Sequence, residues 1–185
     1  LAQATFAATY TVTKTDDTND GTCDTDCSLR EAIAAANGTA DDDVIEFDGT
    51  VFGSMQTIAL SLGELVVDNN GSLTINGTGS DMLSIDGSAS SRIITISDEA
   101  VANINNLTMT NGNGTGALNN NAGGALLNPG GITTIDSCVI SNNVANNGGG
   151  ISNRGGGILT INNSVVSGNL GATSSGGGMQ NFSGS

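Results

Sequence analysis

Short runs in which apolar and polar residues alternate recur along the second half of the chain. The clearest copies, which align without gaps, are residues 101–112, 132–143 and 158–169. Each aligned column keeps nearly one character, as in the column of Ile104, Ile135 and Ile161. A repeat of about 26 residues cannot enclose a core of its own, so successive units must stack and bury these columns. The pattern predicts an all-β fold, a parallel β-helix (β-solenoid), with its coils in residues 51–185.

Apolar pairs continue this pattern upstream, near residues 66, 74, 84 and 95, at spacings of eight to eleven residues. An ordinary β-sandwich has strands at similar spacing. The in-register repeat downstream favours the solenoid over the sandwich.

Glycine-rich segments separate the repeated runs, and each segment places an asparagine at the same point. These asparagines are Asn128, Asn153 and Asn181. Glycine permits the left-handed backbone angles that tight corners need, and asparagine tolerates them while offering an amide to its copy in the next coil. The spacing predicts an asparagine ladder.

The first fifty residues differ from the repeats, because they contain the clearest helix signal. Ser28 and Glu31 stand at the spacing of a capping box, and Leu29 and Ile33 then fall on one helix face. A terminal coil would otherwise expose the core and an unpaired strand edge. We therefore predict that residues 1–50 form an N-terminal cap made of a strand, a disulfide loop and this amphipathic capping helix.

Cysteines support the idea of a cap that is fastened by a loop. Cys23 and Cys27 lie four residues apart in a polar stretch, and neither a histidine nor another cysteine is near enough to complete a metal site. We expect a local disulfide between them, which is typical of exported proteins. Cys138 is expected to be a small buried apolar residue.

Charge and composition exclude several function classes. Eighteen acidic residues against four basic ones give a formal charge of -14, which disfavours nucleic acid and anionic membranes as partners. The absence of histidine excludes histidine-dependent catalytic triads and histidine-ligated zinc sites. The sequence also contains no run of 18 apolar residues, the length needed to span a bilayer. Arg92 and Arg154 are expected to be isolated from the few carboxylates of the repeats. No catalytic residue is therefore predicted, and the chain is expected not to be an enzyme.

An acidic loop resembles part of a calcium-binding loop. Asp16, Asp20 and Asp24 stand at its first, fifth and ninth positions, with Gly21 at the sixth, but Cys27 occupies the place of the bidentate glutamate. Calcium is thus one hypothesis, and a solvated acidic turn beside the disulfide is the alternative. No other cofactor is expected.

Two parts of the sequence resemble known protein families. The stretch Cys27-Ser28-Leu29-Arg30-Glu31-Ala32 resembles the CSLREA motif at the start of bacterial secreted β-helix proteins. The Gly-Gly-Ala-Leu and Gly-Gly-Gly-Ile units, with the runs that begin at Ile140 and Val166, are similar to the repeats of polymorphic outer-membrane-protein adhesins, which prefer phenylalanine at those two positions. The resemblance implies a right-handed parallel β-helix, a hand that parallel crossovers also prefer.

The same resemblance implies an extracellular or bacterial cell-surface location and a non-catalytic role in adhesion or surface structure. A surface carbohydrate or a protein ligand is the expected partner. One alternative is a homo-oligomer or filament that assembles through an open C-terminal end of the solenoid. Another is a polysaccharide lyase or epimerase, or a carbohydrate-binding module, because parallel β-helices also host such proteins.

Overall fold

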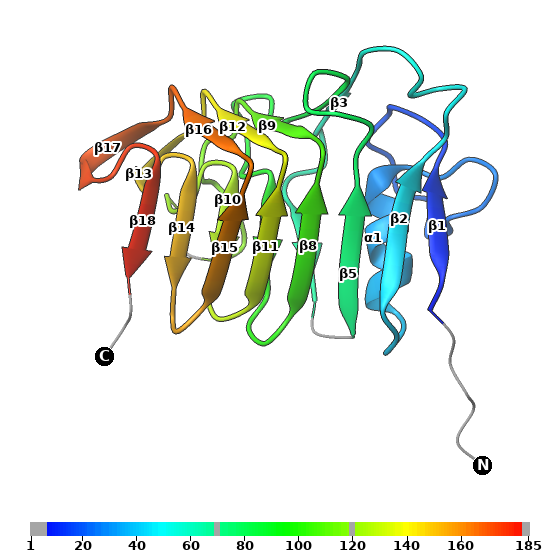
Figure 1. Cartoon of the computed structure of the whole chain (residues 1–185), viewed down its shortest axis with the longest axis horizontal. Coiled ribbons are helices and arrows are strands. Elements are labelled where there is room, and N and C mark those ends of the chain that lie inside the picture. The colour runs from blue at the N-terminus through cyan, green and yellow to red at the C-terminus, as the bar shows by residue number, and fades with distance from the viewer. Residues whose placement is uncertain (1–6, 69–70, 119–120, 183–185) are drawn as a thin grey trace.

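The computed structural model describes residues 7–68, 71–118 and 121–182. The chain winds through five coils, and each coil gives one strand to each of three parallel sheets. In Figure 1 the strands of one sheet point upward in front, the chain returns behind them, and each coil lies to the left of the last. This winding is right-handed, and the predicted parallel β-helix is confirmed.

Sheet A, the front sheet of Figure 1, has six strands. In spatial order they are β1 (Thr9–Val12), β2 (Asp43–Phe47), β5 (Ser72–Asn76), β8 (Val101–Asn105), β11 (Ile132–Asp136) and β15 (Ile158–Asn162). Ile135 pairs with Ile104 on one side and with Ile161 on the other. The column predicted from the sequence is therefore in register.

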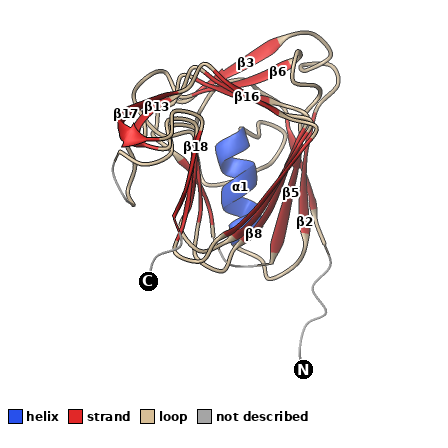
Figure 2. Ribbon diagram, turned by 60° about the vertical axis from the view of Figure 1, so that its left-hand side comes forward, coloured by secondary structure: helices blue, strands red, loops and turns tan. Residues whose placement is uncertain are grey.

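Sheets B and C complete each coil. Sheet B contains β3 (Gln56–Ala59), β6 (Leu83–Asp86), β9 (Thr108–Thr110), β12 (Val139–Ser141) and β16 (Val165–Ser167). Sheet C contains β4 (Leu65–Val67), β7 (Ile94–Ile96), β10 (Leu126–Asn128), β14 (Ile151–Arg154) and β18 (Met179–Phe182). A two-stranded sheet D, of β13 (Val144–Asn147) and β17 (Leu170–Ser175), projects beside the last coils (Figure 2).

Period-two alternation explains which side chains form the core. In β8 the side chains of Ala102 and Ile104 are buried, whereas those of Val101 and Asn103, at the alternate positions, lie on the outer face. Aliphatic columns of this kind fill the space between the three sheets. The corners repeat as well: Asn106, Ser137 and Asn163 follow paired strands and share positive φ angles of 56°, 54° and 46°.

The helix α1 (Leu29–Asn37) covers the N-terminal end of the solenoid, where Figure 2 shows it across the opening that the sheets enclose. Leu29 and Ile33 are each 2% exposed and join the core. The capping role predicted for this helix is confirmed. The predicted boundary at residue 50 does not separate cap from coils, however, because β1 and β2 already pair with each other and β2 pairs with β5 in sheet A.

The last described coil is less enclosed than the others. Leu159, Ile161 and Val166 point into the core but are only partly buried, and no described strand pairs with the far edges of β15, β16 and β18. Residues 183–185, with which the predicted open end finishes, lie outside the described residues. Within the described part of the chain, no helix has the length and apolar character needed to cross a bilayer.

Candidate functional site

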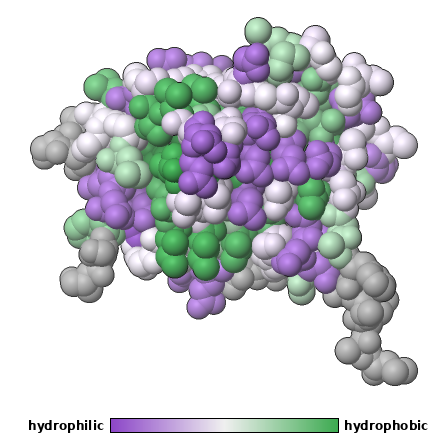
Figure 3. Space-filling view, viewed as in Figure 1, coloured by the Kyte–Doolittle hydropathy of each residue, from purple (hydrophilic) through white to green (hydrophobic). Residues whose placement is uncertain are grey.

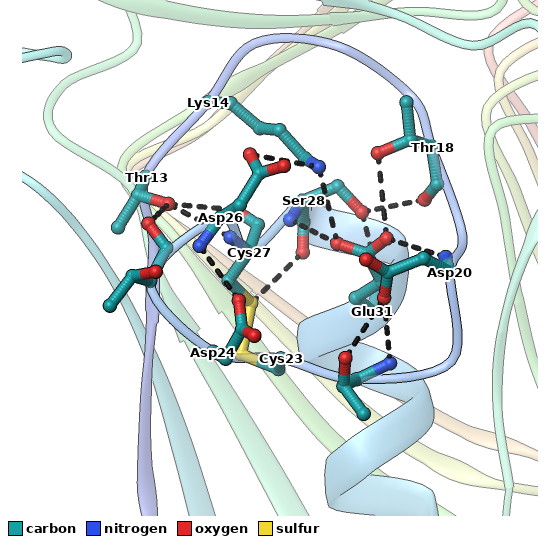
Figure 4. The surroundings of a disulfide bond; sticks show 12 residues. Thr13, Lys14, Thr18, Asp20, Cys23, Asp24, Asp26, Cys27, Ser28 and Glu31 are labelled. Carbon is teal, nitrogen blue, oxygen red and sulfur yellow. Dashed lines mark hydrogen bonds and ion pairs between the residues drawn. A yellow bond between two sulfur atoms is a disulfide. The ribbon is translucent and has the colours of Figure 1, made fainter.

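The loop before α1 is closed by a disulfide, as predicted. Cys23 and Cys27 are bonded with sulfur atoms 2.07 Å apart (Figure 4). The capping box is also present: the Ser28 hydroxyl accepts from the Glu31 N–H at 3.1 Å, and the Glu31 carboxylate accepts from the Ser28 N–H at 2.7 Å. These bonds satisfy helix amides that would otherwise lack partners. The disulfide loop and the helix start form one unit.

Glu31 organises this unit beyond its capping role. Its side chain is 0% exposed, lies 3.6 Å from Lys14 Nζ, and also accepts from the Asp20 N–H at 2.9 Å. Burial opposes ionisation of the Glu31 carboxyl, but the hydrogen bonds from Ser28 and Asp20 and the charge of Lys14 outweigh it, so its pKa lies below the usual value. The carboxylate therefore stays charged and holds the acidic loop against α1.

A second anchor fastens α1 to the first coil. Arg30 donates to both carboxylate oxygens of Asp17, at 2.7 and 3.0 Å, and to the carbonyls of Gly63 and Glu64. Burial opposes ionisation of Asp17, yet Arg30 and the N–H groups of Ser61 and Leu62 lower its pKa. Asp17 belonged to the acidic loop considered for calcium, and sequence reasoning gave it no role of its own.

The predicted calcium ligands are placed differently. Asp16, Asp20 and Asp24 are exposed, and Asp20 and Asp24 accept hydrogen bonds from the backbone of Thr22 and Asp26. No group of three or more acidic or cysteine side chains in the described residues is arranged to hold a metal ion. Calcium binding stays a prediction, and the contacts observed are those of local turns.

The asparagine ladder is confirmed. Asn128 Nδ2 donates to Asn153 Oδ1 at 2.8 Å, and Asn153 Nδ2 donates to Asn181 Oδ1 at 2.9 Å. Asn128 and Asn153 also donate to the carbonyls of Gly131 and Gly157. The ladder thus joins neighbouring coils and ties sheet C to the corner that leads into sheet A.

Sequence analysis missed a second ladder at the corner after sheet B. Asn143 Nδ2 donates to Asn169 Oδ1 at 3.0 Å, and Asn143 Oδ1 accepts from the Gly112 N–H at 2.8 Å. Gly112, Asn143 and Asn169 are the final residues of the three aligned repeats. That shared position was the signal that could have revealed the ladder.

The outer face of sheet A carries in-register rows that lie open to solvent. One row is aliphatic and contains Val101, Ile132 and Ile158, of which Ile132 is 44% and Ile158 57% exposed. A second row contains Thr74, Asn103, Thr134 and Thr160, and a third contains Glu46, Asn76, Asn105, Asp136 and Asn162. Figure 3 shows a polar band across this face with apolar groups above and below it. We call these three rows the sheet A face.

Hydrogen bonds along the polar row keep its side chains in place. Asn76 Nδ2 donates to Glu46 Oε1 at 2.8 Å, and Asn105 Nδ2 donates to Asn76 Oδ1 at 3.0 Å. At the other end of the row, hydrogen bonds from Ser137 and Asn163 lower the pKa of Asp136. These hydrogen bonds restrict the side chains of the row, so the protein would lose little conformational freedom when a ligand binds.

The expectation that Arg92 is isolated is wrong. Its side chain is 0% exposed and Nη1 lies 2.6 Å from Glu64 Oε2, which also accepts from Thr95 Oγ1. Nε and Nη2 donate to backbone carbonyls of residues 114–123. Sequence reasoning missed the pair because its partners come from different coils. Arg154 is half-buried and donates to Ser152 Oγ.

In comparisons with known proteins, no family model, no curated protein and no solved structure matches the chain.

Proposed function

We propose that the protein is a non-catalytic binding module of an extracellular or bacterial cell surface, which attaches to a surface carbohydrate or protein through the sheet A face. The observation that carries this proposal is the set of in-register rows on that face. Each coil adds one similar set of side chains, at the strand spacing of about 4.8 Å. A repetitive ligand would gain a small increment of affinity per coil.

The proposed cellular location rests on the disulfide of the cap. A disulfide between Cys23 and Cys27 persists in oxidising compartments and is rare in the cytosol. The sheet A face supports binding more than chemistry, because its two carboxylates, Glu46 of β2 and Asp136 of β11, lie three strands apart in the sheet. They therefore do not form the close pair that acid–base catalysis by two carboxyl groups uses.

Adsorption tests the proposal directly. The chain would be incubated with cellulose, chitin and peptidoglycan, and with surfaces coated with collagen or fibronectin. Thr134→Arg places a long charged side chain in the middle row, whereas Thr57→Arg places the same charge on the exposed outer face of β3 in sheet B. We expect the first variant alone to lose adsorption. Equal adsorption of both variants, or none by the unaltered protein on any surface, would contradict the proposal.

Self-assembly is a second candidate, favoured by the edge of the last described coil. The strands β15, β16 and β18 offer unpaired backbone groups there, beside the partly buried Leu159, Ile161 and Val166. Further β-structure, of the same chain or of another copy, would pair with this edge. Sedimentation velocity over a wide concentration range separates the two candidates, because assembly through this edge predicts a sedimentation coefficient that rises with concentration.

A further inference from the structure

The four basic side chains of the chain are not equally engaged. The other three each form an ion pair with a carboxylate, whereas Arg154 forms none within the described residues. Its Nε donates to Ser152 Oγ at 3.3 Å, while Nη1 and Nη2 donate to no described residue and are not shielded from solvent. Arg154 therefore carries a positive charge whose outer nitrogens are available to a ligand.

An exposed aromatic ring lies next to Arg154. Arg154 ends β14 and pairs with Phe182, which ends β18, the neighbouring strand at the left of Figure 1. Paired residues of adjacent parallel strands point to the same side of the sheet, about 4.8 Å apart. Phe182 is 59% exposed, whereas the other described aromatic side chains are buried or half-buried. An unpaired guanidinium and an open aromatic face thus stand side by side on the outer face of sheet C.

The corner that follows Arg154 offers two further donors. Gly155 and Gly156 have φ angles of 62° and 89°, and their N–H groups donate to no described residue. A Cβ atom at Gly156 would meet no atom within 4 Å, so the space beside this corner is open. Successive backbone N–H groups of this kind favour anions. The corner can therefore assist Arg154 in holding a carboxylate.

The last two coils suit an anion although the whole chain is acidic. Residues 137–182 contain no aspartate or glutamate, and Arg154 is their only basic residue. Asp98 and Glu99 occupy the corresponding corner two coils earlier, about 10 Å away by the strand spacing. Salt screens charges over about 8 Å at physiological ionic strength. A single carboxylate can therefore approach Arg154, whereas a polyanion would extend over the acidic cap and be repelled.

The two neighbouring side chains indicate the chemistry of a ligand. A guanidinium binds a carboxylate through charge-assisted hydrogen bonds, which are often paired. An aromatic ring packs against apolar surface. An acidic sugar residue combines both features, because its ring has an apolar C–H face and carries a carboxylate. The carboxylate side chain of a peptide lacks such a face beside it.

We propose that Arg154 and Phe182 bind an acidic sugar residue of a surface glycan, with the carboxylate on the guanidinium and the sugar ring on the phenyl ring. The inference rests on the proposed binding function but uses a site distinct from the sheet A face. Only the corner of residues 155–157 separates the two, because it leads from β14 to Ile158 of the aliphatic row. One glycan chain can therefore contact both surfaces.

Nuclear magnetic resonance titration tests this proposal. The acidic probes are methyl β-glucuronide and methyl α-galacturonide. Methyl β-glucoside is their neutral counterpart, acetate is a carboxylate without a ring, and N-acetylglutamate methylamide represents an acidic peptide. We expect at least one acidic sugar to shift the backbone amides of Arg154, Gly155, Gly156 and Phe182, with a dissociation constant of about 1 mM, and the other three probes to shift them much less.

Three results of the titration would overturn the proposal. The first is no shift with either acidic sugar. The second is an equal shift with the neutral glucoside, because the carboxylate would then not be recognised. The third is an equal shift with acetate or with the glutamate derivative, because the sugar ring would then contribute nothing and a protein partner would fit as well.

Variants assign the binding to the two side chains. Arg154→Met removes the charge but keeps an aliphatic stem, and we expect binding of the acidic sugar about tenfold weaker with little loss of stability. Phe182→Ala should weaken binding about threefold to tenfold. Leu170→Ala shortens an apolar side chain of β17 that is 60% exposed, and as the control it should leave binding unchanged. Unchanged affinity in either site variant would overturn the proposal.

The two proposals fail independently. The acidic-sugar site is judged by the titrations, and the sheet A face is judged by adsorption of Thr134→Arg and Thr57→Arg. Loss of adsorption in Thr134→Arg without any shift by an acidic sugar would leave the binding module standing and remove the acidic-sugar site. Shifts by an acidic sugar together with equal adsorption of both variants would do the opposite.

Discussion

Charged side chains pair within the cap and between the first coils, whereas neutral asparagine ladders join the later coils. At α1, Arg30 pairs with Asp17 and Lys14 lies beside Glu31, and in the first coils Arg92 is buried against Glu64. In the later coils Asn128, Asn153 and Asn181 perform the corresponding task through amide hydrogen bonds. An amide side chain both donates and accepts, so a ladder of amides can continue from coil to coil. An ion pair joins only its two members, because their charges neutralise each other.

This difference suits the two regions. The cap occurs once and must be joined to a different kind of structure, and the paired Arg30 and Asp17 achieve this through charge-assisted hydrogen bonds to the backbone of residues 61–64. The coils repeat, and a repeated residue whose side chain bonds to its own copy keeps every coil in register. The charged region should therefore depend on individual residues more strongly than the repeated one.

The largest effect is expected when the cap is broken. Ile33→Asp places a charge where the side chain is 2% exposed, and we expect the free energy of unfolding to fall by about 4 kcal/mol or more, with aggregation through the uncovered core. Denaturant unfolding and light scattering measure the two effects. Ala34→Asp, on the exposed side of α1, is the matched control. If the Ile33→Asp protein is as stable and as monomeric as the control, α1 does not protect the end of the solenoid core.

Removing one partner of the buried ion pair should have the next largest effect. Arg92→Met leaves Glu64 buried without its cation, and we expect a loss of about 3–5 kcal/mol in the free energy of unfolding. The double variant with Glu64→Gln should recover part of this loss. Arg154→Met changes a half-buried arginine and should cost at most about 0.5 kcal/mol. Equal losses of unfolding free energy in the two arginine variants would show that the Arg92–Glu64 pair does not stabilise the fold more than a half-buried arginine does.

Loss of one rung of the ladder should cost less. Asn153→Ala leaves Asn128 and Asn181 without a partner between them, and we expect a loss of about 1–3 kcal/mol, measured by denaturant unfolding. Asn162→Ala, at an exposed position of β15, serves as the control. If the two alanine variants are equally stable, the ladder does not hold the coils together.

Mild acid should affect the two regions differently, with the smallest change. The pKa values of Asp17 and Glu31 are lowered in the folded protein from 3.8 and 4.5, so their contribution is complete above these values and is lost as the pH falls below them. Amide protection factors, which correct for the slower intrinsic exchange in acid, should therefore fall in α1 before they fall in β11 and β14. Simultaneous loss of protection in all three elements would contradict this contrast.

The coils were predictable from sequence because their evidence is repeated. Ile104, Ile135 and Ile161 occupy one column in the alignment and one row in the structure. The capping box and the disulfide were predictable because they are local, joining residues three and four positions apart. Asn128, Asn153 and Asn181 combine both advantages, since they repeat and need only stacking to meet.

Single long-range contacts were not predictable. Glu64 and Arg92 occur once each, and the pairing of their side chains depends on how two corners stack, which no alternation or spacing encodes. The same holds for Asp17, which lies in the acidic loop without a predicted role and binds Arg30. The extent of the cap was also mistaken, because β1 and β2 lack the repeat signal although they pair in sheet A.

Methyl contacts measured in solution test the stacking itself. In a protein with labelled isoleucine methyl groups, nuclear Overhauser effects should connect Ile135 with both Ile104 and Ile161, because paired residues of adjacent parallel strands point to the same side at a separation of about 4.8 Å. If Ile135 shows no such effect to Ile104 or to Ile161, the coils are not in register, and both the described fold and the proposed binding face are wrong.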